Sequence, residues 1–472
     1  MRFLGEAERP AGAIGAPAKA PVRGARSGWD AAPKKSVTRV HVAEICAVVV
    51  AGLLIRIAFL HSPGYHDDMV LFARWFRAIA ALPPGEVYGH VPNLNYPPLY
   101  VVSIEWSALV LRAFVTGPPS DATVDLALKV PPILFDMIGA VLAYAIVRRC
   151  ANHAFALGAA AFMAFNPALI YDSAFWGQND SIPAVLALLA IAALSRGKLI
   201  GAWLSIACAV LVKPPVFVLV PLLLVYPLAL RGPQRRRALG QTAAGMVAAL
   251  VLTQTLAMLF FPHPAPLGSL RDLIAQLVAG SSYFPVNSLN AFNLWAMFGP
   301  FFVSDRTHVL FLSLHVVGDL LFCAAAALIC WRYLASRGTA GLFEASVLLL
   351  SAFFLLLTEM HERYLYYAVV FLAVVLVKRP YRWAALIISL TFLFNLEYGL
   401  TFMYLDDARA TMVNRYEFAP WLVHICSLAN IGVFLWLLSG YLGFAGAAPG
   451  VRALLPEERI DELAWSSKRG PA

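Results

Sequence analysis

The sequence predicts an all-α protein that crosses a membrane many times. Hydrophobic residues make up 60% of its 472 residues, charged residues make up 13%, and the mean hydropathy is +0.72. Soluble domains carry about 25% charged residues, so a soluble globular domain is excluded. The apolar residues also gather in runs suited to helices that cross a bilayer, which need about 20 residues each.

About twelve membrane spans are expected from these runs, joined by polar loops. Residues 1–41, rich in Ala, Pro, Gly and Arg, predict a disordered cytoplasmic tail, and residues 445–472 a second cytoplasmic tail. Residues 42–444 then form one transmembrane domain. The expected spans are 42–61, 129–147, 154–171, 181–195, 199–212, 215–230, 240–261, 307–331, 342–358, 364–377, 383–401 and 420–444.

Clusters of Lys and Arg between the runs predict the orientation. Segments 148–149, 231–237 and 378–382 carry such clusters and fall on the side of the N-terminal tail. Lys and Arg are enriched in cytoplasmic loops, so this side is expected to be the cytoplasm. The net charge of +9 therefore reflects topology, and no nucleic acid partner is expected, because the basic residues form no stripe interleaved with aromatic residues.

Two predicted external loops, 62–128 and 262–306, are much longer than ordinary connections. Both are rich in aromatic residues, which disordered segments lack. In the first loop Asp68, Phe72 and Trp75 recur at helical spacing. This periodicity predicts an amphipathic helix that lies in the membrane interface.

A second helix is expected in the first loop at residues 99–115. This segment is apolar but short, and it carries Glu105 and Arg112. We expect it to be interfacial or re-entrant, because a full span here would break the positive-inside pattern of the loops that follow.

Five unusual polar strings fall on the external side of this topology, each near the end of an expected span. Each has a simpler structural explanation, such as a helix cap, a rigid turn or a snorkelling cation. Their convergence on one face is what makes them candidates, because ionisable residues at the membrane edge are often functional. The strings are "HDD" (66–68), "NYPPLY" (95–100), "WGQND" (176–180), "KPP" (213–215) and "EMHERY" (359–364). The candidate residues are Asp67, Asp68, Asn95, Tyr96, Trp176, Gln178, Asn179, Asp180, Lys213, His361, Glu362 and Arg363.

These side chains combine acids with cations, which suits group transfer. A carboxylate in a partly dry site can accept a proton from an attacking hydroxyl. Lys213, Arg363 and a protonated His361 can hold a phosphate and stabilise its charge as it leaves. At the outer boundary, this combination points to a lipid-linked phosphate donor whose tail stays in the bilayer.

The adjacent acids Asp67 and Asp68 are expected to have different roles. Successive residues in the first turn of a helix point in directions about 100° apart. One carboxylate can cap the helix while the other faces the cavity. Spacing to Phe72 and Trp75 places Asp68 on the inward face, so Asp67 is the expected cap and Asp68 the expected base.

The ordered set "DMVLFARW", "NYPPLY", "WGQND", "KPP" and "HERY" resembles the GT-C superfamily of polytopic glycosyltransferases over residues 42–400. The pattern is most similar to bacterial mannosyltransferases related to the GPI-anchor mannosyltransferases and to the ALG-type glucosyltransferases. The resemblance implies a polyprenyl-phosphate sugar donor, mannose or glucose, and an inverting transfer with Asp68 as the base. It also implies a periplasmic active site in a bacterial inner membrane and a lipid, glycan or protein acceptor. Lys129 and Asp136 match a further family pattern, with a structural or near-site role.

No metal or other cofactor is expected for a monophosphate donor of that family. Relatives that use diphosphate donors carry additional acidic clusters, for which Asp172, Asp180 and Glu359 are the candidates here. The six cysteines include no C-x-x-C pair, so neither a disulfide nor a thiolate metal site is expected.

A transporter or a lipid-linked sugar flippase is the alternative from another functional class. Arg56, Asp136 and Asp319 lie within expected spans, as the ligand groups of transporters do. Transporters, however, are commonly built from internal repeats, and the sequence contains no convincing one.

Overall fold

The computed structural model describes residues 38–281, 283–336, 338, 341–409 and 419–443. The two expected cytoplasmic tails lie almost entirely outside the described residues. The described chain is an array of helices with only four strands of two residues each. The predicted all-α membrane class is confirmed.

Six helices are long and apolar enough to cross a membrane, and a bent helix pair raises this number to seven. Five shorter apolar helices complete the set that matches the twelve expected runs, so the count of twelve spans stays a prediction. The long helices are α1 (Arg39–Ala58), α5 (Asp121–Val147), α11 (Gly232–Phe260), α13 (Leu314–Ala335), α16 (Arg379–Arg409) and α17 (Pro420–Leu442). The bent pair joins α6 (His153–Phe165) to α7 (Pro167–Ile170) and the π-helix η1 (Tyr171–Trp176) at 41°. The shorter segments are α8 (Ser181–Ser195), α9 (Leu199–Val212), η2 (Pro214–Leu219) with α10 (Val220–Ala229), α14 (Leu342–Leu356) and α15 (Tyr366–Val375).

The short helices end inside the helix array. The ten residues of α15 rise about 15 Å, half of a hydrocarbon core of about 30 Å, and every one of them is buried. Helix α9 stops at Val212 because Pro214 and Pro215 follow and cannot continue its hydrogen bonds. Irregular backbone at such depth is tolerated only where protein covers it, so the polar ends of these helices face one another.

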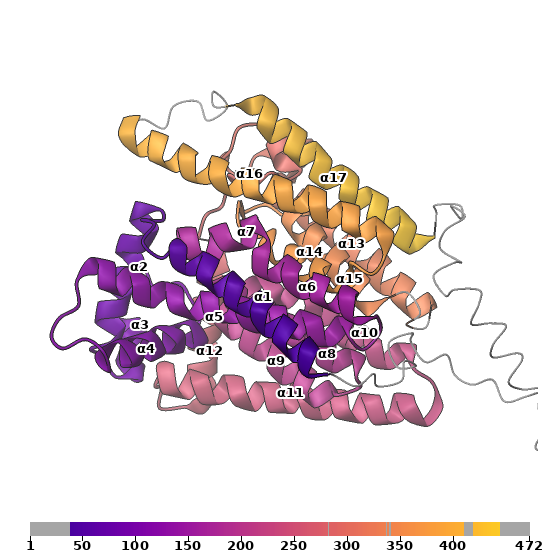
Figure 1. Ribbon diagram of the computed structural model, residues 1–472, viewed down its shortest axis with the longest axis horizontal. Coiled ribbons are helices and arrows are strands. Elements are labelled where there is room, and N and C mark those ends of the chain that lie inside the picture. The colour runs from indigo at the N-terminus through magenta and orange to yellow at the C-terminus, as the bar shows by residue number, and fades with distance from the viewer. Residues whose placement is uncertain (1–37, 282, 337, 339–340, 410–418, 444–472) are drawn as a thin grey trace, which may run out of the picture.

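Residues 62–128, predicted to form the first external loop, fold into helices that gather at one end of the molecule with α12 (Figure 1). These are α2 (His66–Ile79), α3 (Pro84–His90) and α4 (Pro98–Arg112), and α12 spans Pro266–Ser281. In α2, Phe72 and Trp75 are buried while Arg74 and Arg77 are exposed, which confirms the predicted amphipathic pattern. Helix α4 packs against α2 and α5, so the loop contains the second helix that was expected.

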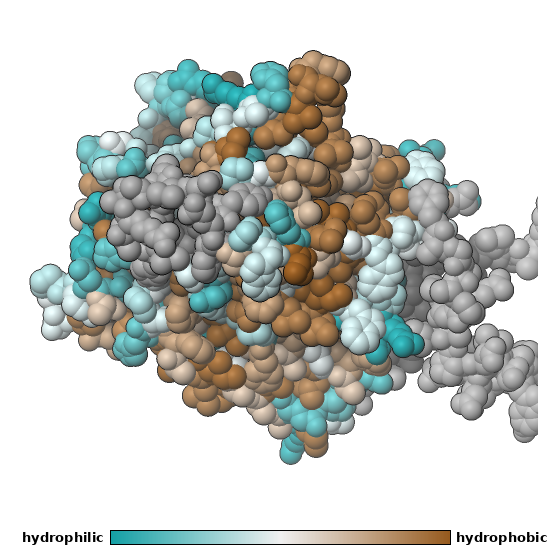
Figure 2. Space-filling model, turned by 90° about the horizontal axis from the view of Figure 1, so that it is seen from above, coloured by the Kyte–Doolittle hydropathy of each residue, from teal (hydrophilic) through white to brown (hydrophobic). Residues whose placement is uncertain are grey.

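The outer surfaces of α16 and α17 carry large exposed apolar side chains, such as Trp383, Leu390, Ile425 and Leu435. Figure 2 shows hydrophobic residues spread over the middle of this face, with hydrophilic residues more frequent at the end where α2 to α4 lie. Such a surface is suited to lipid and not to water.

The second external loop is folded and is tied to the "HERY" segment. Strand β1 (Ser288–Leu289) pairs in parallel with β4 (Met360–His361), which immediately precedes Glu362 and Arg363. A hairpin of β2 (His308–Val309) and β3 (Leu312–Ser313) leads into α13. The expected span start at residue 307 is therefore wrong, because the Ser313 side chain caps α13 by accepting the backbone N–H of Val316.

An ion pair buried between the spans joins α1 to α5. Arg56 Nε lies 2.7 Å from Asp136 Oδ2, and both side chains are fully buried. Asp136 also accepts hydrogen bonds from Ser173 and Tyr366, and Arg56 donates to the carbonyl of Ala164. Both charges are thus satisfied within the fold, as expected of structural groups.

We predict that Asp136→Leu destabilises the protein by about 3 to 5 kcal/mol, because Arg56 stays buried without its carboxylate. Thermal unfolding of purified protein in detergent measures the loss. The double variant Arg56→Met with Asp136→Leu should be clearly more stable than Asp136→Leu alone. Equal losses in the two variants would show that the pairing of charges is not what matters here.

Candidate functional site

Asp68 lies in the first turn of α2 and faces the "WGQND" segment. Its Oδ2 accepts hydrogen bonds from Trp176 Nε1 at 3.1 Å and Gln178 Nε2 at 2.8 Å. The side chain is half-buried, and in the part of the chain that the structure describes its Oδ1 accepts none. One oxygen is therefore fixed in place while the other is left for a ligand.

The expectation that Asp67 caps α2 is wrong. The residue at the cap position is Tyr65, with no side-chain cap hydrogen bond, so both acids lie within the first helical turn. Asp67 is exposed, and its carboxylate accepts a hydrogen bond from the Tyr65 hydroxyl at 3.1 Å. Asp67 and Asp68 thus differ in the side of α2 that each one faces, and neither of them caps the helix.

Two close contacts hold the start of α2 against the turn that contains Trp176. Lys129 Nζ donates to the Ser62 carbonyl at 2.7 Å and to the Phe175 carbonyl at 3.2 Å, which joins the segments before α2 and before Gly177. At Gly64, with φ +64°, a Cβ would stand 2.4 Å from the Trp176 carbonyl oxygen. Only glycine permits this approach, which sets the distance between Asp68 and its two donors.

The cations Lys213 and Arg363 lie beside the carboxylate of Asp180 and form the cationic side of the site. Lys213 Nζ lies 2.7 and 2.8 Å from the two Asp180 oxygens, and Tyr367 donates its hydroxyl proton to the same carboxylate. Arg363 Nε lies 3.8 Å from Asp180, and its Nη1 donates to Glu362 Oε1 at 2.7 Å. Asp180 thus joins the ends of α8, α9 and α15.

Tyr96 lies between the acidic and cationic sides. Lys213 Nζ stands 5.7 Å from the centre of its ring, and the charges of Arg363, Asp180 and Asp68 all act on its hydroxyl. The "NYPPLY" string therefore contributes an aromatic wall, and Pro98 begins α4 at the first helical position, as expected from its fixed φ.

Arg363 is a permanent cation in this setting. Burial acts to lower its pKa, but Glu362, Tyr96 and Asp68 together raise that pKa well above its usual value. Burial raises the pKa of Glu362, opposed by the nearby guanidinium. His361 differs, because burial and then the charges of Arg363 and Lys213 lower its pKa well below the usual value. The surrounding side chains thus favour the neutral imidazole, whereas the sequence analysis expected the protonated form beside a phosphate.

Several buried polar atoms around the site have no hydrogen-bond partner among the described residues. They include Asn95 Oδ1, Gln178 Oε1, Asn179 Nδ2 and Arg363 Nε. Buried polar atoms are rarely left unpaired, so their convergence here indicates space for a polar ligand. A cleft next to them is lined by Asn179 together with Phe72, Tyr100, Ser103 and Pro131.

Two contributors to this site, Tyr364 and Tyr367, were not identified as site residues from the sequence. Tyr364 stacks with Lys213, whose Nζ is 5.3 Å from the ring centre, and Tyr367 binds Asp180. Asp172 is fully buried, and the structure shows no partner for either of its oxygens among the described residues. The "RYLYY" run after Glu362 was the available signal for the tyrosines.

The alternative acidic cluster of Asp172, Asp180 and Glu359 does not assemble. Asp180 is engaged by Lys213, while Glu359 lies beside Asp305 and His315 instead.

Known proteins show only distant similarity to this chain. No family model matches the sequence, and no curated protein matches it. A structure of the Archaeoglobus fulgidus oligosaccharyltransferase tethered to an acceptor peptide containing the NVT sequon is 14% identical, with a TM-score of 0.37; the match covers 90% of this chain and 58% of that one. A second structure, of the Archaeoglobus fulgidus oligosaccharyltransferase AglB with an inhibitory peptide and a dolichol-phosphate, is 13% identical, with a TM-score of 0.37. This match covers 90% of this chain and 60% of that one. This chain thus spans less than two thirds of the length of either oligosaccharyltransferase.

We predict that Lys129→Met loosens the start of α2. Losing a charged hydrogen bond removes about 1.5 to 3 kcal/mol, so hydrogen exchange in residues 59–68 and 172–178 should accelerate by at least roughly tenfold. Exchange mass spectrometry of the purified protein measures this. Lys198→Met, at an exposed position, is the control. Unchanged exchange in the Lys129 variant would mean that other contacts hold this junction.

Proposed function

We propose that this protein is a GT-C type glycosyltransferase that moves a hexose, mannose in preference to glucose, from a polyprenyl-phosphate donor to an acceptor hydroxyl. The acceptor is a lipid, glycan or protein on the outer face of the membrane. The observation that supports this most is the placement of Asp68, with one oxygen held by Trp176 and Gln178 and the other open. The buried cations Lys213 and Arg363 stand within the same cluster.

Asp68 acts as the general base in the proposed step. Its open oxygen takes the proton from the acceptor hydroxyl while that oxygen attacks the anomeric carbon of the sugar. The bond from the anomeric carbon to the phosphate oxygen breaks, and the configuration inverts. The products are the glycosylated acceptor, the lipid phosphate and a protonated Asp68.

Arg363 and Lys213 hold the phosphate in this proposal. The guanidinium of Arg363 is buried and permanently charged, and its Nε has no hydrogen bond in the described chain. A charge-assisted hydrogen bond from this group stabilises the charge that builds on the leaving phosphate. His361, the Oε1 of Gln178 and the Nδ2 of Asn179 are assigned to sugar hydroxyls, because these two amide atoms have no hydrogen-bond partner among the described residues. Tyr96 and Asn95 border the sugar on the side of α4.

The transporter alternative loses part of its support. Arg56 and Asp136 were two of the charges that favoured a transporter, and they form an ion pair with each other inside the fold. One assay separates the two functions. Purified protein is supplied with polyprenyl-phosphate mannose or glucose and a panel of membrane-derived acceptors, and glycosylated product is measured. Product identifies a transferase, whereas movement of the donor across a vesicle membrane without product identifies a transporter.

Asp68→Asn is predicted to lower turnover by roughly 10² to 10⁴-fold, because it keeps the shape of the side chain but removes the base. Initial rates of transfer at saturating donor measure the effect. Asp67→Asn is the matched control, one residue away and exposed, and it should cost far less. A reversed order would move the base to Asp67. Normal rates in both variants would place the base elsewhere, with Asp180 and Glu362 next to be tested.

Arg363→Ala is predicted to weaken donor binding. The lost charge-assisted hydrogen bond is worth about 1.5 to 3 kcal/mol, which raises the dissociation constant of polyprenyl-phosphate sugar by roughly tenfold to 150-fold. Titration of the donor in the absence of acceptor measures it. Arg74→Ala, on the exposed side of α2, is the control for net charge. An unchanged dissociation constant would remove Arg363 from the phosphate site.

A further inference from the structure

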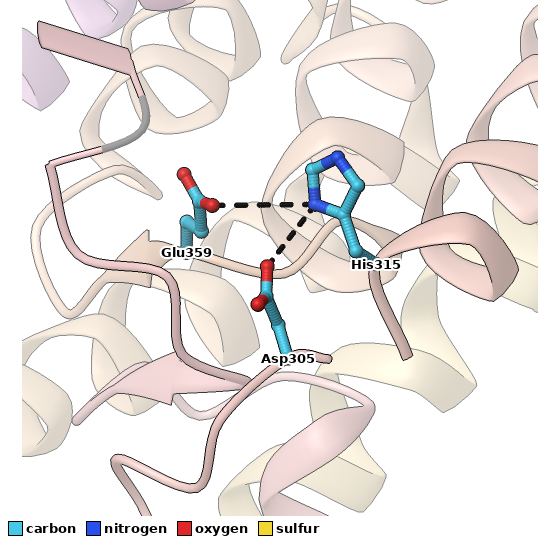
Figure 3. A group of neighbouring side chains, drawn as sticks. All are labelled: Asp305, His315 and Glu359. Carbon is cyan, nitrogen blue, oxygen red and sulfur yellow. Dashed lines mark ion pairs between the residues drawn. The ribbon is translucent and has the colours of Figure 1, made fainter. Parts of the chain in front are cut away.

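A second group of polar side chains lies outside the site built on Asp68. Asp305 comes from the second external loop, His315 is the second residue of α13, and Glu359 immediately precedes β4 (Figure 3). His315 Nδ1 lies 3.1 Å from Asp305 Oδ2 and 4.0 Å from Glu359 Oε1. One ligand atom from each of the three residues lies within 4.8 Å of the others, so all three can reach a common point.

The backbone holds these three residues in place. The N–H of Glu359 donates to the carbonyl of Val286 at 2.8 Å, and the N–H of Asp305 donates to that of Pro285 at 3.2 Å. The N–H of His315 donates to the carbonyl of Asp305 at 3.0 Å. The group is therefore assembled by the fold and not by flexible side chains reaching across a surface.

The group carries more negative charge than its neighbours balance. Asp319 stands 3.4 Å from the other ring nitrogen of His315, so three carboxylates surround one imidazole. Among the described residues, none of these acids forms an ion pair with a Lys or Arg, and the hydroxyl of Thr358, 3.3 Å from His315 Nδ1, adds no charge.

The two ring nitrogens of His315 have different neighbours. Asp319, one helical turn along α13, lies 3.4 Å from Nε2, whereas Asp305 and Glu359 lie on the Nδ1 side of the ring. With a metal ion at Nδ1, Asp319 can accept a hydrogen bond from the N–H at Nε2. A carboxylate behind the imidazole is the arrangement that orients histidine ligands in metal sites.

We propose that Asp305, His315 and Glu359 bind one divalent transition-metal ion, Zn²⁺ or Mn²⁺. One imidazole with two carboxylates suits these ions, whereas Mg²⁺ and Ca²⁺ prefer oxygen ligands alone. The ion would fasten the second external loop and the start of α13 to the residue before β4. This proposal does not rest on the proposed function.

Metal binding by the full-length protein tests the proposal directly. Purified protein is stripped with a chelator and titrated with ZnCl₂ or MnCl₂ by calorimetry, and bound metal is counted by mass spectrometry after gel filtration. The expected result is one ion per chain and a higher thermal unfolding temperature with metal than without it.

Two conservative variants test the ligands. Glu359→Gln and Asp305→Asn should each weaken binding by at least about tenfold and abolish the metal-dependent rise in unfolding temperature. Glu86→Gln, an exposed acid on α3 of the same external region, should bind as the unaltered chain does. If one variant fails to fold, the other decides. Absence of a bound ion in the unaltered chain, or retention of it in the variants, overturns the proposal.

Discussion

The buried ion pair of Asp180 with Lys213 is the interaction on which the rest of the site depends. Both side chains lie at helix ends that stop inside the array, and both are almost completely buried. Charges at that depth are stable only when paired and hydrogen-bonded. The pair therefore requires α8, α9 and α15 to end close together, and it requires Arg363 and Tyr367 to complete its surroundings. The early end of α9, set by Pro214 and Pro215, places Lys213 within reach of Asp180.

Next to the ends of the short helices α8 and α9 lie the helices of residues 62–128, the predicted first external loop. Helix α2 docks through Gly64 and Lys129 onto the turn that precedes α8, so Asp68 is positioned by the same segment that positions Asp180. The acid and the cations are thus held at a fixed separation by backbone contacts and not by their mutual attraction.

Much of this architecture could be predicted from the sequence, because hydropathy and periodicity record which face of a helix is buried. They indicated the apolar runs, the inward face of α2 and the gathering of five polar strings at one boundary. They do not record tertiary partners. The neutral state of His361 depends on burial beside Arg363, and the association of Asp305 with Glu359 depends on the pairing of β1 with β4. Neither the surroundings of His361 nor the association of Asp305 with Glu359 can be recognised from the residues next to them in the sequence.

The separation of acid and cations has a direct electrostatic meaning for the proposed transfer. As the acceptor proton moves to Asp68, that carboxylate loses its negative charge, and the leaving lipid phosphate gains one. The reaction therefore moves a unit of negative charge from the side of Trp176 to the side of Arg363 without changing the total charge of the site. Fixed donors and a permanent guanidinium stabilise that shift without reorganising.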